Sequence, residues 1–377
     1  MGNRSRVLVI DSDYATCAAA VERAFSAFPR DVKGKNVVVK VNAIRACDPD
    51  HAAIVTHPAL VKAVVDRLAG MGPRQVIVGD SVGTESYGRS QQVFETTGLA
   101  EAAGPCYRNL PRNLEAVELE RPFRRKVAVL KDVLEADLYI SLPKMKTHGL
   151  TLLSGAVKNN YGLLAGAQKS WYHFHSETPE RFAQVLIELF FMRPPDLVIM
   201  DGILAMEGYG PCSPETRWVN KILVSDDAVA LDTVMGHMMG FRAEEVPYLR
   251  LARERGGQTD LAAMEIEGDH SPIAGFRRPV VMPESTYCYL SGVGGGKTSR
   301  AFFADRVCLR PVIEAEKCPP GCTACTDACS SGALEPGRPP ILTSSACMLC
   351  SACMEACAHG ALQLKPDPSL RKEIDPA

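Results

Sequence analysis

Short apolar runs alternate with stretches of helical spacing through most of the chain. The apolar runs cover residues 7–10, 37–41, 75–78, 138–142, 197–200 and 221–224. Residues 14–28 and 57–71 carry apolar side chains at the three- and four-residue spacing of amphipathic helices, and the second stretch stops at a Gly-Pro pair. This rhythm predicts an α/β fold with a mainly parallel sheet and covering helices.

Eight of the fourteen cysteines form a repeated pattern near the carboxyl end. Each half has three closely spaced cysteines and then a fourth, and the two halves are offset by 28 or 29 residues. The repeat resembles bacterial two-cluster ferredoxins, in which the fourth cysteine of each run binds the other cluster. We therefore expect two 4Fe-4S clusters, one held by Cys318, Cys322, Cys325 and Cys357 and the other by Cys347, Cys350, Cys353 and Cys329.

Two other interpretations of these cysteines compete with the ferredoxin pattern. Zinc also binds Cys-x2-Cys pairs, but eight thiolates in two similar halves favour iron–sulfur clusters. The spacing Cys318-x3-Cys322-x2-Cys325 resembles the radical SAM motif, although the 52 residues that follow are too few for the barrel of that family. The first run departs from the ferredoxin pattern by one extra residue, which bears on ligation by Cys318, and Ser330 and Ala358 stand where proline is common.

The composition also divides the chain. At 377 residues it exceeds a typical single domain, and apolar periodicity weakens near Pro279 before a Cys-, Pro- and Gly-rich stretch. We expect an α/β domain of one or two lobes over residues 1–300 that receives a substrate or a partner. A two-cluster ferredoxin-like α+β domain is expected over residues 308–365, and a polar tail over residues 366–377.

A polar, cationic segment directly follows the apolar run 138–142. Lys144 and Lys146 alternate at strand spacing and so share a face, which His148 continues if the chain stays extended. Lys158 and Asn159 are expected on a short helix. Such donors can bind a carboxylate or phosphate and supply a general acid. We predict catalytic roles for His148, Lys158 and Lys146 and substrate-binding roles for Lys144 and Asn159; the alternative is a solvated basic turn.

Further polar residues follow other predicted strands. Because functional groups gather where parallel strands end, their convergence would make a pocket. We predict substrate-binding roles for Asn42, Asp80 and Glu207, with Lys40, Ser81 and Asp201 as neighbouring candidates. A single Asp at such a position is more often a helix cap or turn residue. Asp226 and Asp232 are expected to be structural.

Two further segments carry weaker signals. Residues 171–175 are expected to form a loop that covers a site, with His173 and His175 lacking the flanking ligands of a metal centre. Residues 289–299 resemble a phosphate-binding loop, but Ser291 stands where the pattern needs glycine, so a glycine-rich hinge is favoured. No Gly-x-Gly-x-x-Gly follows an early strand, and no motif decides whether a flavin or another organic cofactor joins the clusters.

Five polar or glycine-containing motifs are spread along most of residues 5–260, at residues 79–81, 143–148, 155–159, 206–211 and 226–232. Taken together, these motifs resemble the bacterial and archaeal family named domain of unknown function 362. The chain departs from the family at residues 41–42, Val-Asn in place of the common Pro-Asn. Members often carry a carboxy-terminal ferredoxin, so the resemblance implies an iron–sulfur protein with an α/β substrate domain, but it names no reaction.

Charge and length of apolar runs exclude some classes of partner. With 42 basic and 44 acidic residues, the chain has a net charge of -2 and no overall field to attract nucleic acid or an anionic membrane. No run approaches the ~20 apolar residues of a membrane span, and the amino terminus lacks the apolar core of a secretory signal. We expect a soluble, cytoplasmic protein.

These observations favour an iron–sulfur oxidoreductase that passes single electrons through two 4Fe-4S clusters to a small anionic organic substrate, for instance to reduce a double bond. It would exchange electrons with an external low-potential partner of ferredoxin or flavodoxin type. One alternative is a non-catalytic electron-transfer or assembly subunit that docks a partner enzyme. Another is a lyase or isomerase acting on a hydroxy acid.

Overall fold

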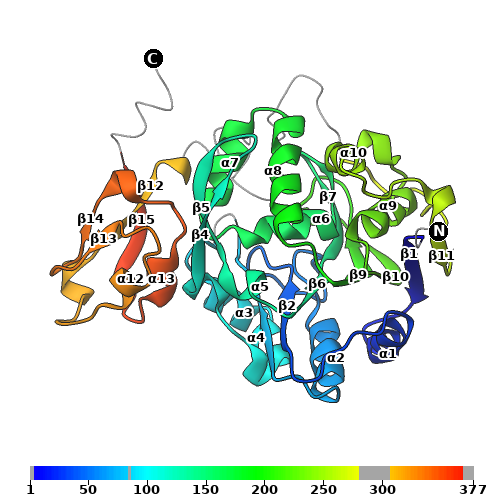
Figure 1. Ribbon diagram of the computed structural model, residues 1–377, viewed down its shortest axis with the longest axis horizontal. Coiled ribbons are helices and arrows are strands. Elements are labelled where there is room, and N and C mark those ends of the chain that lie inside the picture. The colour runs from blue at the N-terminus through cyan, green and yellow to red at the C-terminus, as the bar shows by residue number, and fades with distance from the viewer. Residues whose placement is uncertain (1–3, 84–85, 280–305, 368–377) are drawn as a thin grey trace.

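A computed structural model describes residues 4–83, 86–279 and 306–367 (Figure 1). The glycine-rich segment 289–299, the predicted boundary near residue 300 and most of the predicted tail lie outside these residues. The strands are β1 Arg6–Asp11, β2 Asn36–Val41, β3 Gln75–Gly79, β4 Leu114–Leu119, β5 Arg125–Leu130, β6 Leu138–Leu142, β7 Lys144–His148, β8 Leu152–Ser154, β9 Leu197–Met206, β10 Thr216–Ser225, β11 Glu265–Glu267, β12 Leu309–Ile313, β13 Leu334–Glu335, β14 Ile341–Leu342 and β15 Leu362–Pro366. The helices are α1 Cys17–Ala27, α2 Pro58–Ala69, α3 Ser90–Thr96, α4 Leu99–Ala103, α5 Lys131–Leu134, α6 Ala156–Asn159, α7 Gln168–Ser176, α8 Pro179–Met192, α9 Ala228–Met238, α10 Pro247–Glu254, α12 Ala324–Asp327 and α13 Ala352–Ala356.

Nine strands form one mixed sheet. Its main path runs β11-β1-β10-β9-β6-β2-β3, and β7 joins β9 on one side and β8 on the other. The central pairs β9–β6, β6–β2 and β2–β3 are parallel, whereas β10 is antiparallel to β9 and β1. The α/β class with a mainly parallel sheet is therefore confirmed. The antiparallel β10 was not expected; it follows β9 directly, without the helical crossover that a parallel pairing requires.

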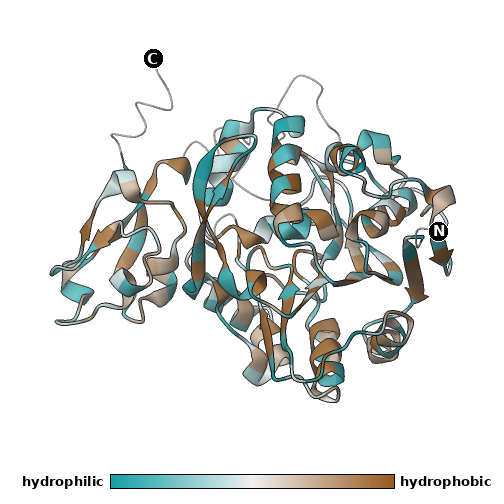
Figure 2. Ribbon diagram, in the orientation of Figure 1, coloured by the Kyte–Doolittle hydropathy of each residue, from teal (hydrophilic) through white to brown (hydrophobic). Residues whose placement is uncertain are grey.

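Helices cover both faces of this sheet. In Figure 1, α1 and α2 lie below the strands and α8, α9 and α10 lie above them. Two large apolar cores result, one packed mainly under α1 and α2 and the other under α6, α8, α9 and α10. Figure 2 shows the same division as hydrophobic colour on the central strands and hydrophilic colour on outer parts of the helices.

Local sequence explains why these elements form. Strand β2 reads Asn-Val-Val-Val-Lys-Val, and its valines are all buried, as expected of a strand covered on both faces. Helix α2 begins where the His57 side chain accepts a hydrogen bond from the Ala59 N–H at 3.1 Å and where Pro58 occupies the first turn. It ends at Gly70. Both predicted helices, 14–28 and 57–71, match α1 and α2 within a few residues.

Residues 306–367 form a small unit at one end of the molecule, orange to red in Figure 1. It contains two antiparallel strand pairs, β12–β15 and β13–β14, and the short helices α12 and α13. Its small core is built from Cys325, Leu334, Cys353 and Leu362. Cysteines therefore take up much of the interior of this unit, where a domain of this size would otherwise need more apolar side chains.

Candidate functional site

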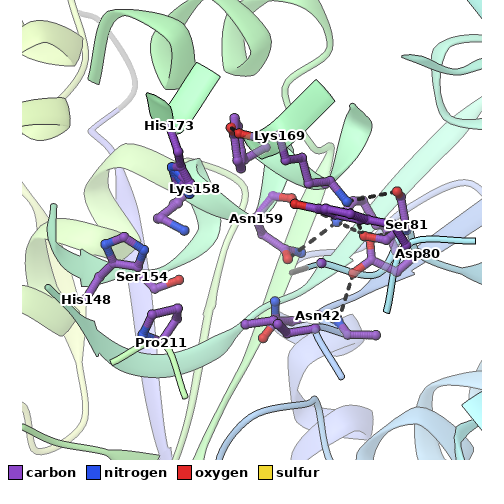
Figure 3. A pocket seen from close by; sticks show the side chains of 17 residues that line it. Asn42, Asp80, Ser81, His148, Ser154, Lys158, Asn159, Lys169, His173 and Pro211 are labelled. Carbon is purple, nitrogen blue, oxygen red and sulfur yellow. Dashed lines mark hydrogen bonds and ion pairs between the residues drawn. The ribbon is translucent and has the colours of Figure 1, made fainter. Parts of the chain in front are cut away.

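A pocket with a volume of about 80 Å³ lies at the carboxyl ends of β2 and β3, between these strands and the helices α6 and α7. One buried water needs only ~15 Å³ on the same measure, so the space suits a small molecule. Figure 3 shows lysine, histidine and asparagine side chains pointing into it from several elements. It is lined by Lys40, Asn42, Ala43, Ile44, Asp80, Ser81, Gly83, Tyr87, His148, Ser154, Lys158, Asn159, Tyr161, Gly162, Lys169, His173 and Pro211.

One side of the pocket is a buried ion pair. Lys40 Nζ lies 2.7 Å from Asp80 Oδ1, and both side chains are almost fully buried. Lys40 also donates to the Asn159 carbonyl oxygen at 2.8 Å, and Asp80 accepts from the backbone N–H groups of Ala43 and Ser81, both at 2.8 Å. Burial lowers the pKa of Lys40, and the charge of Asp80 opposes that shift. The pair is internally satisfied and holds the ends of β2 and β3 together.

Lys169 closes the same side from α7. Its Nζ donates three hydrogen bonds, to the Ser81 carbonyl at 2.6 Å, the Ser81 hydroxyl at 2.8 Å and the Val82 carbonyl at 2.8 Å. All three acceptors are uncharged. Burial therefore lowers the pKa of Lys169 to about 7, since no partner fully compensates the ammonium group.

Lys158, on α6, projects into the pocket with its ammonium group available. It is half-buried, and within the described residues its Nζ makes no hydrogen bond or ion pair. Its Nζ lies over the Tyr161 ring, 5.8 Å from the ring centroid. Burial, aided by the positive charge of Lys146, lowers the pKa of Lys158 to about 7, so about half of these side chains carry a proton near neutral pH.

His148 ends β7 beside Lys158, as Figure 3 shows. Its Nδ1 accepts hydrogen bonds from the backbone N–H groups of Leu150 at 3.1 Å and Thr151 at 3.2 Å. An accepting Nδ1 in a neutral ring assigns the proton to Nε2. Burial and the charge of Lys158 lower the pKa of His148 well below its ordinary value. His148 is therefore a neutral ring that offers an Nε2–H donor, not a charged acid.

Lys146 lies behind the pocket wall. Its Nζ donates to the side-chain oxygen of Asn42 and, at 3.1 Å, to the Ile54 carbonyl. Burial lowers the pKa of Lys146 to about 8. Because a lysine only donates, the amide oxygen of Asn42 must face Lys146, which turns the Asn42 NH₂ group elsewhere.

Five of the eight predicted catalytic and substrate-binding residues line this pocket, Lys146 lies behind its wall, and two lie elsewhere. Lys144 pairs with Asp201 at 2.7 Å, with both side chains fully buried, and it also donates to the Tyr14 hydroxyl at 2.8 Å. Glu207 accepts hydrogen bonds from Arg217 at 2.8 Å and Arg277 at 2.9 Å. Neither lines the pocket, so substrate-binding roles for Lys144 and Glu207 gain no support from the geometry. Asn42, Asp80, Lys158, Asn159 and His148 do line it.

Sequence reasoning missed part of the wall. Residues 171–175, expected as a loop, are helical and belong to α7, which brings Lys169 and His173 to the pocket. Lys169 lies on a helix and follows no strand, so the expectation that functional groups gather at strand ends does not predict it. The useful signal was the pair of apolar residues Trp171 and Phe174, three positions apart, which is typical of a helix.

The eight carboxy-terminal cysteines are unbridged, and seven of them lie near others of the set. Cys329, Cys347, Cys350 and Cys353 line one cavity together. Burial raises the pKa of Cys350 to about 12, and the thiols of Cys347 and Cys329 add to that shift. Burial likewise raises the pKa of Cys325, whose thiol neighbours are Cys357 and Cys318. Within the described residues, no three His, Cys, Asp or Glu side chains are placed to hold a metal ion, so ligation stays a prediction.

The cysteine-rich unit packs directly against the pocket-forming helix α7. The Gln168 N–H donates to the Leu349 carbonyl at 3.2 Å, and Tyr87 and Ala167 share a small core with Leu349. A Cβ atom at Gly166 would lie 2.5 Å from the carbonyl carbon and oxygen of Cys350. The backbone of Gly166 therefore packs against the backbone of Cys350, three residues before Lys169 in the sequence.

A second contact fixes the same unit. Glu355, buried on α13, accepts hydrogen bonds from the Ser90 N–H at 3.0 Å, the Ser90 hydroxyl at 2.7 Å and the Asn109 side chain at 2.9 Å. Arg112 donates to the Glu355 carbonyl at 2.6 Å. Because hydrogen bonds to a charged acceptor are strong, the Glu355 carboxylate fixes the orientation of the cysteine-rich unit relative to the α/β domain.

The sequence matches a family described as Domain of unknown function (DUF362) over residues 37–237, more than half of the chain. The chain belongs to this family. The matched DUF362 region supplies the pocket from Lys40 to Pro211, and the cysteine-rich unit lies beyond it. A curated relative, the thylakoid-associated protein sll1697 of Synechocystis sp., is 29% identical over 242 residues, which cover 61% of this chain and 70% of that protein.

Two solved structures are distantly similar. The lactate racemase apoprotein of Thermoanaerobacterium thermosaccharolyticum gives a TM-score of 0.39 at 15% identity and covers 59% of this chain. A protein of Thermotoga maritima gives 0.36 at 11% identity and covers 57%. The chain spans 54% and 56% of their lengths. Among the described residues, no helix combines the length and apolar character needed to cross a bilayer.

Proposed function

We propose that the protein is an iron–sulfur oxidoreductase that reduces a small anionic organic substrate in the pocket around Lys158. The observation that carries this proposal is the direct packing of the cysteine-rich unit against α7, the helix whose Lys169 forms the pocket wall. Electron delivery to a bound substrate requires a redox centre in contact with the substrate pocket.

Two 4Fe-4S clusters in a ferredoxin-like domain over residues 308–365 are part of this proposal. Support comes from the cavity lined by Cys329, Cys347, Cys350 and Cys353, which is the set expected from the crossed repeat. The other set, Cys318, Cys322, Cys325 and Cys357, is supported by the proximity of Cys325 to the Cys357 and Cys318 thiols. When bound, the clusters would supply electrons one at a time from an external ferredoxin or flavodoxin.

The lining residues divide the remaining work. Lys158 holds the anionic group and, with a pKa of about 7, can give up a proton near neutral pH. The Nε2–H of His148 donates a hydrogen bond to the same group. Reduction of a carbon–carbon double bond takes up two electrons and two protons and forms two C–H bonds; Lys158 gives one proton and solvent gives the other.

The lining of the pocket separates this proposal from a non-catalytic carrier. A subunit that only docks a partner enzyme has no need of a pocket lined by lysines such as Lys158 and Lys169, which have no carboxylate partner among the described residues, because such groups are costly to bury. We place the protein in the cytoplasm as part of this proposal; the name of the cyanobacterial relative refers to thylakoids and belongs to that protein.

The first test is iron and acid-labile sulfide per chain in anaerobically purified protein, followed by electron paramagnetic resonance after reduction. We expect roughly eight irons, coupled signals from the reduced clusters and no response to S-adenosylmethionine. Reduced protein mixed with short unsaturated carboxylates should then reoxidise, and Lys158→Met should slow that step while leaving the spectra unchanged. About four irons, or a signal perturbed by S-adenosylmethionine, would contradict the proposal.

A further inference from the structure

The polar groups of the pocket fall into two sets with different hydrogen-bonding states. On the side of Lys40, Asp80 and Lys169, each charged group is matched by protein acceptors or donors. On the opposite side, Lys158 Nζ and the Ser154 hydroxyl make no hydrogen bond to any described residue, and His148 Nε2 has an N–H to donate. Figure 3 shows these three side chains grouped at one end.

Asn42 adds a donor on another wall of the pocket. Its side-chain oxygen accepts from Lys146, so its NH₂ group is directed away from that lysine, and this group donates to no described residue. Lys146 itself uses two of its three N–H bonds, to Asn42 and to the Ile54 carbonyl. Donors without acceptors therefore stand at two places, at the His148–Lys158 end and at Asn42.

The charges around the pocket do not balance. Asp80 is the single carboxylate among the described lining residues, and Lys40 neutralises it. Lys158 and Lys169, together with Lys146 behind Asn42, have no carboxylate partner within the part of the chain that the structure describes. A buried excess of positive charge is unfavourable unless an anion compensates it. Burial lowers the pKa of all three amines, as expected where no anion compensates their charge.

We propose that the pocket takes a short dicarboxylate, one carboxylate bound by Lys158, His148 and Ser154 and the other by Asn42. This inference names the substrate class and rests on the proposed function. Two carboxylates match the two donor sites and compensate lysines that have no carboxylate partner, whereas a monocarboxylate leaves one donor site unmatched. The small volume of about 80 Å³ restricts the ligand to a short carbon chain.

The experiment is calorimetric titration of the full-length protein with its clusters oxidised and no electron donor present. The ligands are malonate and succinate, the monocarboxylates propionate and butyrate of the same carbon counts, and inorganic phosphate. We expect each dicarboxylate to bind at least roughly tenfold more tightly than its matched monocarboxylate, and more tightly than phosphate. Equal affinity for the two carboxylate classes, preference for phosphate, or no binding of any dicarboxylate would overturn the inference.

Variants locate the binding site. Lys158→Met and Asn42→Ala should each weaken succinate binding by roughly tenfold or more, while Lys62→Met, an exposed lysine on α2, should leave it unchanged. Asn42→Ala also removes an acceptor of buried Lys146, so Ser154→Ala, which deletes a hydroxyl that bonds no described residue, keeps the test valid if either variant fails to fold and should likewise weaken succinate binding. If every pocket variant bound succinate as tightly as the natural protein, the assignment would be contradicted. The titration involves no electron transfer, so it tests binding separately from the redox proposal. Dicarboxylate binding by protein with few irons per chain would contradict only the redox proposal. Roughly eight irons per chain without dicarboxylate binding would contradict only this inference.

Discussion

The carboxylate of Asp232, on α9, accepts a hydrogen bond from the backbone N–H of Ala156 at 2.6 Å. It accepts a second from the Val157 N–H at 3.0 Å, and the two bonds together fix the start of α6. The carboxylate is completely buried, and burial raises its pKa to about 7 against the opposing effect of the two N–H donors. Helix α6 has only four residues and carries Lys158 and Asn159. Asp232 therefore holds the pocket residues in place without touching the pocket.

A methyl group at Gly155 tests this support. A Cβ there would overlap the carboxylate of Asp232 and push it away from the start of α6. We expect Gly155→Ala to lower the free energy of unfolding by about 1–3 kcal/mol and to weaken succinate binding. Urea denaturation and titration calorimetry measure the two effects. Gly70→Ala is the matched control, since its φ is -71° and its nearest neighbour, the Arg67 carbonyl oxygen, lies 3.6 Å from the added atom. Equal stability of the two variants would contradict the role given to Asp232.

Lys169 predicts a pH dependence of stability. Its pKa is lowered in the folded protein from the ordinary 10.5 to about 7, so between these values the unfolded chain binds the proton more strongly. The free energy of unfolding is therefore highest above pH 10.5, where Lys169 is neutral in both states. It decreases as the pH falls toward about 7, because the unfolded chain takes up the proton first. Relative to Lys169→Met, the natural protein should gain up to about 1 kcal/mol per pH unit from about pH 7 to about pH 10. Urea denaturation across this range measures the difference. Lys33→Met, at an exposed lysine, should show no such trend, and a flat difference for Lys169→Met would refute the prediction.

Lys144 is expected to act on stability and not on ligand binding. Replacing it with methionine leaves the buried carboxylate of Asp201 without its cation, which costs about 3–5 kcal/mol in comparable pairs. Lys62→Met breaks the exposed pair with Asp66 and should cost less than about 1 kcal/mol. Thermal or urea denaturation separates the two. A folded Lys144→Met variant that fails to bind succinate would restore the substrate-binding role that its sequence position predicts.

The crossed assignment of the cysteines can be tested by comparing single serine variants. Cys329→Ser and Cys350→Ser should remove the same cluster, and Cys325→Ser and Cys357→Ser should remove the other, with each variant losing roughly four irons. Electron paramagnetic resonance of the remaining reduced cluster identifies which one survives. Cys106→Ser, at a cysteine outside both sets, should keep full iron content. If Cys329→Ser instead left the same signal as Cys325→Ser, each run would hold its own cluster.

Much of the fold follows from local sequence, because buried parallel strands and amphipathic helices have distinct patterns. The valines of β2 and the spacing in α2 place these elements within a few residues. Strand β7 is different, since Lys144, Lys146 and His148 make it polar in sequence although every residue in it is buried. Its place beside β9 depends on partners far along the chain, such as Asp201 for Lys144, and a local pattern contains no information about such partners.

The candidate site was predictable where its residues follow strands. Asn42 and Asp80 were found because parallel strands end at a common edge. Glu207 also stands at the end of a strand, β9, but two arginines bind it away from the pocket. Lys169 was missed because it reaches the pocket from the first turn of a helix, and only the tertiary packing of α7 brings it there.

The close approach at Gly166 bears on how this protein relates to others of its family. With φ of +60° and the Cys350 carbonyl against it, residue 166 tolerates no side chain as long as the cysteine-rich unit is docked. In a relative without such a unit, no Cys350 carbonyl would limit the size of this residue. The left-handed backbone angle would remain, so we expect glycine or a residue that accepts this conformation, such as asparagine. Position 166 is therefore a place where we expect family members with and without a docked cysteine-rich unit to differ in sequence, with glycine in those that carry the unit.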